Sequence, residues 1–262
     1  MRTMRTIAPA VVLALVACSK PDPAEVHQNK GDEHFVKGQF KAAAEEYRLS
    51  LEANPQQKKA DKLLEKEAYA YMKAGDTDKA AAVLLKTMES KTDPKEKVEL
   101  LHTIANIYVE KGPPEKVEQY YLEALKIDPK DLDALAWLGE VASQQGGARS
   151  AKAGAVPKYL EKAIGYYDQA IALNPSALLP YVNKRIALLK YVEYERLEKE
   201  AADRDAQFAK KRSPAVAEAK ERAAKAQAKM DELRAQIEPI SAKISEMTKK
   251  PKPDAGTTVN IN

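Results

Sequence analysis

Glycine recurs along this chain at a nearly constant interval, and that interval constrains the fold more than any other feature. Gly38, Gly75 and Gly112 are spaced 37 residues apart, and Gly146 follows 34 residues later. An amphipathic helical pattern ends at each of the first three, and another begins directly after it. A single helix pair cannot bury its own apolar face, so pairs repeated at this period predict a solenoid in which each pair packs on the next.

The repeated units also share residue types at fixed positions. Each first helix holds a small residue: Gly31, Ala68, Ala105 and Gly139. Each second helix carries a small residue and, four positions later, a bulky one: Ala43 and Tyr47, Ala80 and Leu84, Val117 and Tyr121, Ala163 and Tyr167. A proline closes three of the units, at Pro55, Pro129 and Pro175, whereas Thr92 stands in the second. Small residues permit close helix approach and bulky ones fill the remaining gaps, so these positions serve packing.

This pattern resembles the tetratricopeptide repeat over about residues 24–190, as four repeats and a fifth first helix from Leu178. The resemblance implies an all-α solenoid whose first helices line a groove for a peptide or protein partner. The groove positions that it implies are Gln28, Asp32, Phe35, Glu65, Tyr69, Met72, His102, Asn106, Glu140 and Gln144. Chaperone-binding members of the family use Lys, Arg and Asn there to hold a terminal carboxylate, an arrangement that this chain lacks. Trp137, the only tryptophan, is a further interface candidate.

The residues after the solenoid predict a long helical hairpin over 191–248, followed by a disordered tail over 249–262. Apolar residues from Val216 to Met247 recur in alternating steps of three and four, which is typical of a coiled coil. The preceding helix repeats these steps at Tyr194, Leu197, Ala201, Arg204 and Phe208. A Ser-Pro break at 213–214 separates the two, so we expect an antiparallel coiled-coil-like pair in which Phe208 faces Ala219.

The first residues have the pattern of an export signal. Basic residues precede an apolar run from Ile7 to Ala17, which is too short to span a bilayer but suits a signal peptide over 1–17. Leu15-Val16-Ala17-Cys18 resembles the lipobox of bacterial lipoproteins, which implies a lipid on Cys18 and a short linker over 18–23. By the same resemblance, Ser19 favours the periplasmic face of the outer membrane, with the inner membrane or cell surface as alternatives. An ordinary secretory signal is the other interpretation.

Composition and motifs argue against most chemical functions. The net charge of +4 is small for 262 residues and forms no basic block, so we expect no nucleic-acid partner. The single cysteine excludes an internal disulfide framework, and the three histidines lack metal-ligand spacing. Phosphate-binding loops and nucleophile elbows are absent. We therefore expect no catalytic residues, no metal, no cofactor and no enzyme activity.

Two functions remain open at this stage. The first is a non-catalytic adaptor, held in the bacterial envelope by lipid, that binds an envelope protein or peptide and aids assembly of a membrane or envelope complex. The second is a structural spacer or self-associating protein that acts through the hairpin, over residues 194–247. An insertion over 147–157 is more typical of a tolerated loop than of a binding loop. The sequence leaves the partner and the pathway open.

Overall fold

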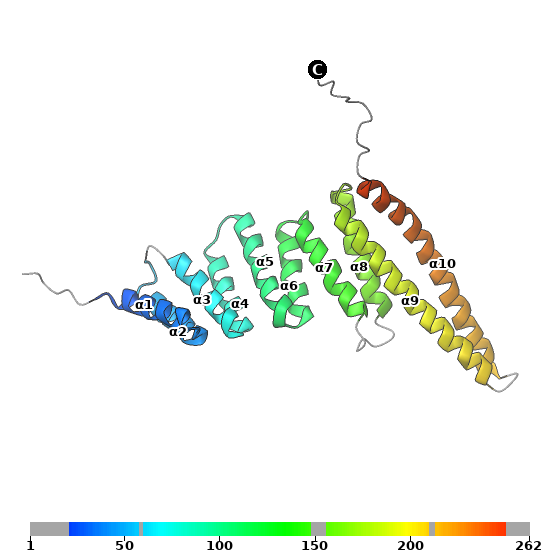
Figure 1. The fold of residues 1–262 in the computed structure, drawn as a ribbon, viewed down its shortest axis with the longest axis horizontal. Coiled ribbons are helices and arrows are strands. Elements are labelled where there is room, and N and C mark those ends of the chain that lie inside the picture. The colour runs from blue at the N-terminus through cyan, green and yellow to red at the C-terminus, as the bar shows by residue number, and fades with distance from the viewer. Residues whose placement is uncertain (1–20, 58–59, 148–155, 210–212, 250–262) are drawn as a thin grey trace, which may run out of the picture. The chain divides into compact units, whose positions relative to one another are not determined.

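A computed structural model describes residues 21–57, 60–147, 156–209 and 213–249. These residues form helices joined by short connections (Figure 1), and no strand occurs among them. The helices are α1 (Pro23–Val36), α2 (Phe40–Ala53), α3 (Ala60–Ala74), α4 (Thr77–Glu89), α5 (Pro94–Lys111), α6 (Pro114–Ile127), α7 (Leu132–Gly147), α8 (Val156–Leu173), α9 (Leu178–Phe208) and α10 (Pro214–Thr248). The all-α solenoid predicted from the sequence is confirmed.

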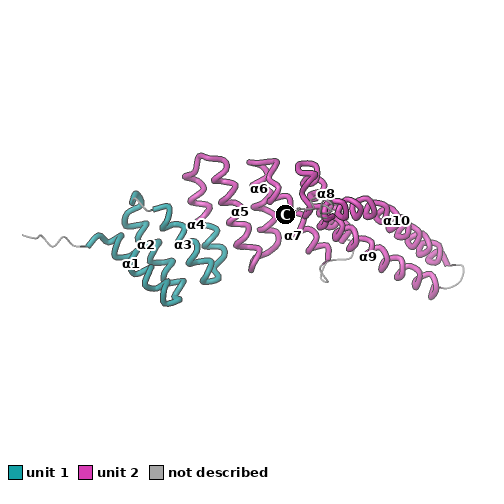
Figure 2. The backbone as a smooth tube through the Cα atoms, turned by 45° about the horizontal axis from the view of Figure 1, so that its top comes forward, with its two compact units in different colours: residues 1–83 teal, residues 84–262 magenta. Residues whose placement is uncertain are grey.

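The chain divides into two compact units, residues 1–83 and residues 84–262 (Figure 2). The first unit contains α1, α2, α3 and the first half of α4, and the second contains the remainder. The boundary therefore falls inside the second repeat, whose closing position carries Thr92 in place of proline.

Local sequence signals explain where several helices begin and end. Asp22 precedes α1, and its carboxylate accepts a hydrogen bond from the Ala24 backbone nitrogen at 3.0 Å. Ser213 caps α10 in the same way, ahead of a proline in the first turn. Gly38 and Gly75, which end α1 and α3, have φ angles of 72° and 80°, a region that disfavours residues with a side chain. These two repeated glycines therefore mark real turns, whereas Gly146 lies inside α7.

Packing inside the repeats follows the predicted size pattern. All the small and bulky positions of the four repeats are buried: Gly31, Ala43, Tyr47, Ala68, Ala80, Leu84, Ala105, Val117, Tyr121, Gly139, Ala163 and Tyr167. A Cβ atom at Gly31 would lie 2.5 Å from the Tyr47 ring, and one at Gly139 would lie 2.4 Å from the Tyr167 ring. In these two repeats glycine therefore leaves the room that the tyrosine ring occupies, whereas the third repeat pairs Tyr121 with Ala105.

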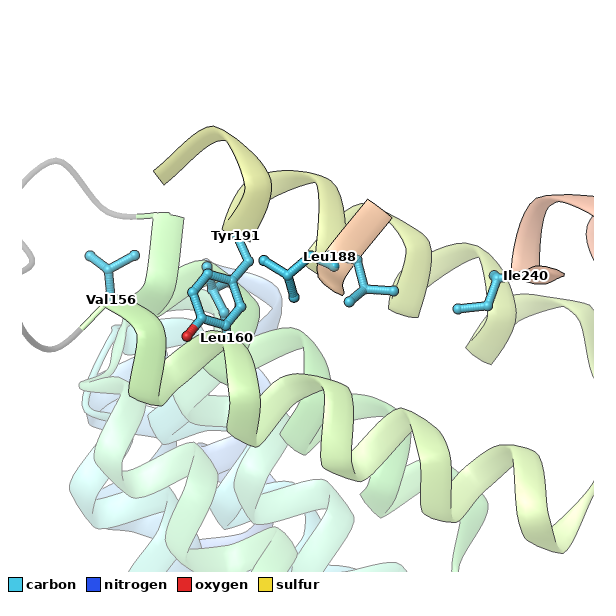
Figure 3. Close-up of a cluster of buried hydrophobic side chains, with 6 residues drawn as sticks. Val156, Leu160, Leu188, Tyr191 and Ile240 are labelled. Atoms are coloured by element: carbon cyan, nitrogen blue, oxygen red, sulfur yellow. The ribbon is translucent and has the colours of Figure 1, made fainter. Parts of the chain in front are cut away.

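Helices α9 and α10 form the predicted hairpin, and its base joins the last repeat through one buried cluster. Figure 3 shows that cluster. It combines residues of α8, α9 and α10: Val156, Leu160, Leu188, Tyr191, Leu233 and Ile240. The predicted seam of α10 is confirmed, since its central members are buried: Ala219, Ala223, Ala226, Met230 and Leu233.

The predicted seam of α9 is wrong at Leu197 and Phe208, although Tyr194 packs against the buried cluster as expected. Phe208 is 80% exposed and Leu197 is 50% exposed, whereas Tyr191 and Ala202 are buried instead. Helix α9 continues without a break from the last repeat into the hairpin. The residues that it buries at the base, Leu188 and Tyr191, therefore set the face that it turns toward α10 along its whole length. That face brings the small Ala202, and not Phe208, against the alanine-rich α10.

Some predictions concern residues outside the described ranges. The signal peptide over 1–17, the lipid on Cys18 and most of the tail over 249–262 lie there, as does most of the insertion over 147–157. At the edge of that insertion the prediction needs correction. Val156 and Pro157 begin α8 instead of ending a loop, because the Val156 side chain is buried in the cluster at the base of the hairpin.

Candidate functional site

The first unit presents a cluster of aromatic rings, formed by Phe35, Phe40 and Tyr69, which we call the aromatic surface. The Phe35 ring lies 5.2 Å from the Phe40 ring and 5.7 Å from the Tyr69 ring, centroid to centroid. Tyr69 is 44% exposed, and the Lys73 ammonium lies 5.2 Å from its ring centroid. Phe35 lies in the last turn of α1 and Tyr69 lies on α3, so two successive first helices contribute to this surface, together with Phe40 at the start of α2.

Asp32 links the two first helices of this unit beside the aromatic surface. Its carboxylate accepts hydrogen bonds from the Tyr47 hydroxyl at 2.7 Å and from the Lys66 ammonium at 2.6 Å. Partial burial raises the pKa of Asp32, but the hydrogen bonds from Lys66 and Tyr47 outweigh it and hold that pKa below its ordinary value. Asp32 is therefore an ionised, paired side chain that fixes α3 against α1.

In the second unit, His102 belongs to a network that ties α5 to the start of α7. Its Nε2 atom lies 2.6 Å from Asp131 Oδ2, while the other Asp131 oxygen accepts a hydrogen bond from the Ala134 backbone nitrogen at 3.0 Å. The His102 ring lies 5.3 Å from the Tyr121 ring, which in turn stacks on Trp137 at 6.1 Å. His102 therefore stabilises the packing between two successive repeats, and Asp131 caps α7.

Trp137 and Glu140 line a pocket of about 270 Å³ in the second unit. The end of α5, the start of α6 and one side of α7 surround it. We call it the Trp137 pocket, and its lining residues are Tyr108, Val109, Gly112, Pro114, Val117, Trp137, Glu140, Val141, Gln144 and Gln145. Trp137, named above as an interface candidate, is 37% exposed, and Val109 is 41% exposed. An indole and an aliphatic side chain therefore face solvent beside a carboxylate.

The ten predicted groove residues all lie on first helices, but they do not form one set. Phe35 and Tyr69 meet in the aromatic surface, and Glu140 and Gln144 share the Trp137 pocket. Gln28 and Met72 are partly buried, and Glu65 is exposed. The side chains at the remaining three positions form hydrogen bonds within their own unit. Asp32 bonds to Tyr47 and Lys66, and His102 bonds to Asp131. Asn106 accepts a 2.8 Å hydrogen bond from the Tyr121 hydroxyl.

Sequence reasoning missed several exposed apolar residues on first helices, among them Val109, Ile186 and Leu189. Val109 follows the small Ala105 by four positions, the same offset that relates Phe35 to Gly31 and so could have revealed it. Ile186 and Leu189 are 42% and 50% exposed on α9, where the fifth first helix extends the array. Ile186 and Leu189 could have been predicted by extending the repeat pattern past residue 178 into α9.

The described residues offer no site for metal chemistry, because no group of three or more His, Cys, Asp or Glu side chains among them could hold an ion. Their strongest pKa perturbations fall on tyrosines. Burial raises the pKa of Tyr47, Tyr121 and Tyr167 well above the ordinary value of 10.0. These rings are the packing residues of the repeats, so the perturbation reflects the core. No helix in the described ranges combines the length and apolarity needed to cross a membrane.

Comparison with known proteins gives a family and a set of relatives. The tetratricopeptide repeat profile matches residues 24–57 and 98–131. The photosystem I assembly protein Ycf3 of a Synechococcus species is 29% identical over 127 residues, which cover 45% of this chain and 73% of the relative. Ycf3 of Cyanophora paradoxa is 28% identical over 162 residues, or 56% of this chain and 86% of that protein.

Solved structures are similar over most of the chain at low sequence identity. A tetratricopeptide repeat protein from Bacteroides fragilis is 13% identical with a TM-score of 0.49, over 86% of this chain and 98% of that one. A tetratricopeptide repeat protein from Parabacteroides merdae is 18% identical with a TM-score of 0.46, over 87% and 81%. The matched repeats coincide with the helix pairs α1–α2 and α5–α6. The chain therefore carries tetratricopeptide repeats, which are an architecture for protein–protein interaction.

Proposed function

We propose that this protein is a non-catalytic adaptor, anchored by lipid on Cys18 in a bacterial envelope, that helps another membrane or envelope complex to assemble. The observation that carries the proposal is the exposure of aromatic rings on first helices, above all Tyr69 beside Phe35. Aromatic side chains with one apolar face and one polar end are enriched where proteins bind each other. The partner is a protein or peptide of the same envelope.

The assembly role draws support from the relatives. The matched relatives are named for photosystem I assembly, and they are 28–29% identical to this chain over 127 and 162 residues. We carry over the role of an assembly factor and not the photosystem, because a likeness at this level reflects a common architecture and does not select a partner. The polar groups near the aromatic surface, such as Asp32, are engaged in ion pairs and hydrogen bonds that hold the repeats together. Exposed aromatic rings beside polar groups that are already paired suit a surface that binds a partner, and they require no catalytic step.

The lipid anchor rests on the sequence before residue 21. A basic start, a short apolar run and a lone cysteine after Leu15-Val16-Ala17 fit a bacterial lipoprotein leader. A Cys18→Ser variant tests this part separately. We expect the unaltered protein to sediment with membranes and to carry an acyl mass on Cys18, and the variant to keep its leader and carry no acyl mass. An unmodified cysteine in the mature protein would contradict the anchor.

The adaptor role is tested by crosslinking the full-length protein in its own cells and identifying the proteins that co-purify. Tyr69→Ala removes an exposed ring, so we expect it to reduce capture of the main envelope partner by about tenfold or more, as for a residue at the centre of an interface. Tyr69→Phe keeps the ring and its contact with Phe35, and is the matched control. Unchanged capture by the alanine variant, with helical content preserved, would exclude the aromatic surface as the binding site.

A second function is favoured by one observation on the hairpin. Phe208 and Leu197 are exposed on α9, although their spacing predicts a buried seam. A hairpin that self-associates would cover such residues, so light scattering of the full-length protein in detergent should then give a dimer. The double variant Leu197→Glu and Phe208→Glu should make that dimer monomeric. A monomeric unaltered protein would rule out self-association through the hairpin.

A further inference from the structure

The fourth repeat departs from the first and third in the hydrogen bond of its buried tyrosine. Tyr47 and Tyr121 donate to a side chain on the first helix of their own repeat, Asp32 in one case and Asn106 in the other. The corresponding pair in the fourth repeat is Tyr167 and Glu140. The Tyr167 hydroxyl is buried and has no partner among the described residues. Glu140 instead accepts a hydrogen bond from Gln144 at 2.9 Å and lines the Trp137 pocket.

The Trp137 pocket is built to accept hydrogen bonds and positive charge. Among the described residues that line it, Glu140 is the acidic one and none is basic. Gln145 Oε1 is buried without a donor in the described part of the chain. A buried acceptor without a donor costs free energy that a donating ligand would recover. The pocket therefore favours a ligand that carries several N–H donors and a positive charge.

The pocket also offers an aromatic wall. One face of Trp137 stacks on Tyr121, which does not line the pocket, whereas Trp137 itself does. Cations are attracted to the face of an indole, and the planar guanidinium of arginine stacks on it. At about 270 Å³ the pocket lies just below the roughly 300–1,000 Å³ of small-molecule sites, which suits one large side chain rather than a whole ligand.

We propose that the Trp137 pocket receives an arginine side chain from the partner protein. The methylene groups lie against Trp137 and Val109, and the guanidinium donates to Glu140 and to the Gln145 carbonyl. Arginine fits better than lysine because its fixed, forked donors can serve two acceptors at once while its plane stacks on the indole. The inference rests on the proposed binding function and specifies the chemistry of one contact within it.

The single tryptophan gives a direct test, since all tryptophan emission of this chain arises from the pocket. The full-length protein in detergent is titrated with the blocked tripeptide acetyl-Ala-Arg-Ala-amide and with its Lys, Leu and Glu counterparts. We expect a saturable change of Trp137 emission with the Arg peptide, weakened by added salt because the contact is between charges. Equal affinity for the Lys peptide would overturn the assignment to arginine. Equal affinity for the Leu or Glu peptide, or no change with any peptide, would overturn the cationic site.

Two variants locate the contact. Glu140→Gln should lower the affinity for the Arg peptide by at least about tenfold, because it removes the charge from a charge-assisted hydrogen bond. Asp133→Asn makes the same change on α7 outside the pocket lining and should leave the affinity within about twofold, as expected for a charge that makes no direct contact. Equal affinity of Glu140→Gln and the unaltered protein would refute the proposal. The titration uses no cellular partner, so its failure is distinct from a failure to co-purify one.

Discussion

The repeats and the hairpin pack helix against helix by different means. In the first and fourth repeats a tyrosine crosses a glycine so closely that one added carbon would overlap the ring, at 2.5 Å for Gly31 and 2.4 Å for Gly139. In the hairpin, α10 presents a row of alanines to α9: Ala219, Ala223 and Ala226. A large residue over a small one admits one arrangement, whereas a smooth row of alanines admits several. The difference explains why size pattern predicted the repeats correctly and misplaced the face of α9.

The largest effect that separates the two regions should come from the base of the hairpin. Leu233→Ala removes a buried side chain from the cluster that joins α8, α9 and α10. We expect it to lower the free energy of unfolding by about 2–5 kcal/mol, as for other buried leucines. Leu197→Ala, on the exposed side of α9, should change it by less than about 0.5 kcal/mol. Urea unfolding followed by circular dichroism measures both, and equal effects would restore the seam first predicted.

The glycine–tyrosine crossing should give the next effect. Gly139→Ala places a Cβ atom 2.4 Å from the Tyr167 ring, so we expect a loss of about 1–3 kcal/mol from overpacking. Gly165→Ala on α8 meets nothing within 4 Å and should stabilise the protein by about 0.5–1 kcal/mol, through the higher helix propensity of alanine. Melting temperatures that shift the same way in both variants would show that the crossing is not tight.

A smaller contrast lies among the repeats themselves. Tyr47→Phe deletes a 2.7 Å hydrogen bond to Asp32 and should cost about 1 kcal/mol. Tyr167→Phe removes a buried hydroxyl that has no partner among the described residues, so it should be neutral or slightly stabilising. Denaturant midpoints at pH 7 compare the two variants. A comparable loss from Tyr167→Phe would reveal a partner for that hydroxyl and weaken the argument for the Trp137 pocket.

The smallest effect is a pH dependence on the alkaline side. Burial raises the folded-state pKa of Tyr121 far above the value of 10.0 expected in the unfolded chain. The unfolded chain therefore loses this proton first, so the stabilisation is complete below pH 10 and is lost as the pH rises above it. Tyr121→Phe should reduce the fall in unfolding free energy between pH 9 and pH 10.5 by under about 1 kcal/mol. An identical fall in the variant would contradict this assignment.

Sequence reasoning was reliable where a position demands one residue type. Gly38 and Gly75 were found because their turns require glycine, and the tyrosine positions because they alternate with small residues. The aromatic surface was half predicted, since Phe40 begins a second helix and lay outside the positions considered. The Trp137 pocket could not be predicted, because its polar lining depends on the orientation of the Glu140 side chain. That side chain accepts a hydrogen bond from Gln144 and none from Tyr167. A residue pattern specifies faces of helices, but not the choice between two hydrogen-bond partners.

Helix α9 belongs to two structures at once, since it is the fifth first helix of the array and one arm of the hairpin. Its partner α10 occupies the side on which another second helix would otherwise pack. Tandem duplication in the gene can therefore lengthen the array upstream of Leu178 and not beyond it, because a unit added later would have no free helix to join. The number of repeats can change during evolution while the terminus keeps its form.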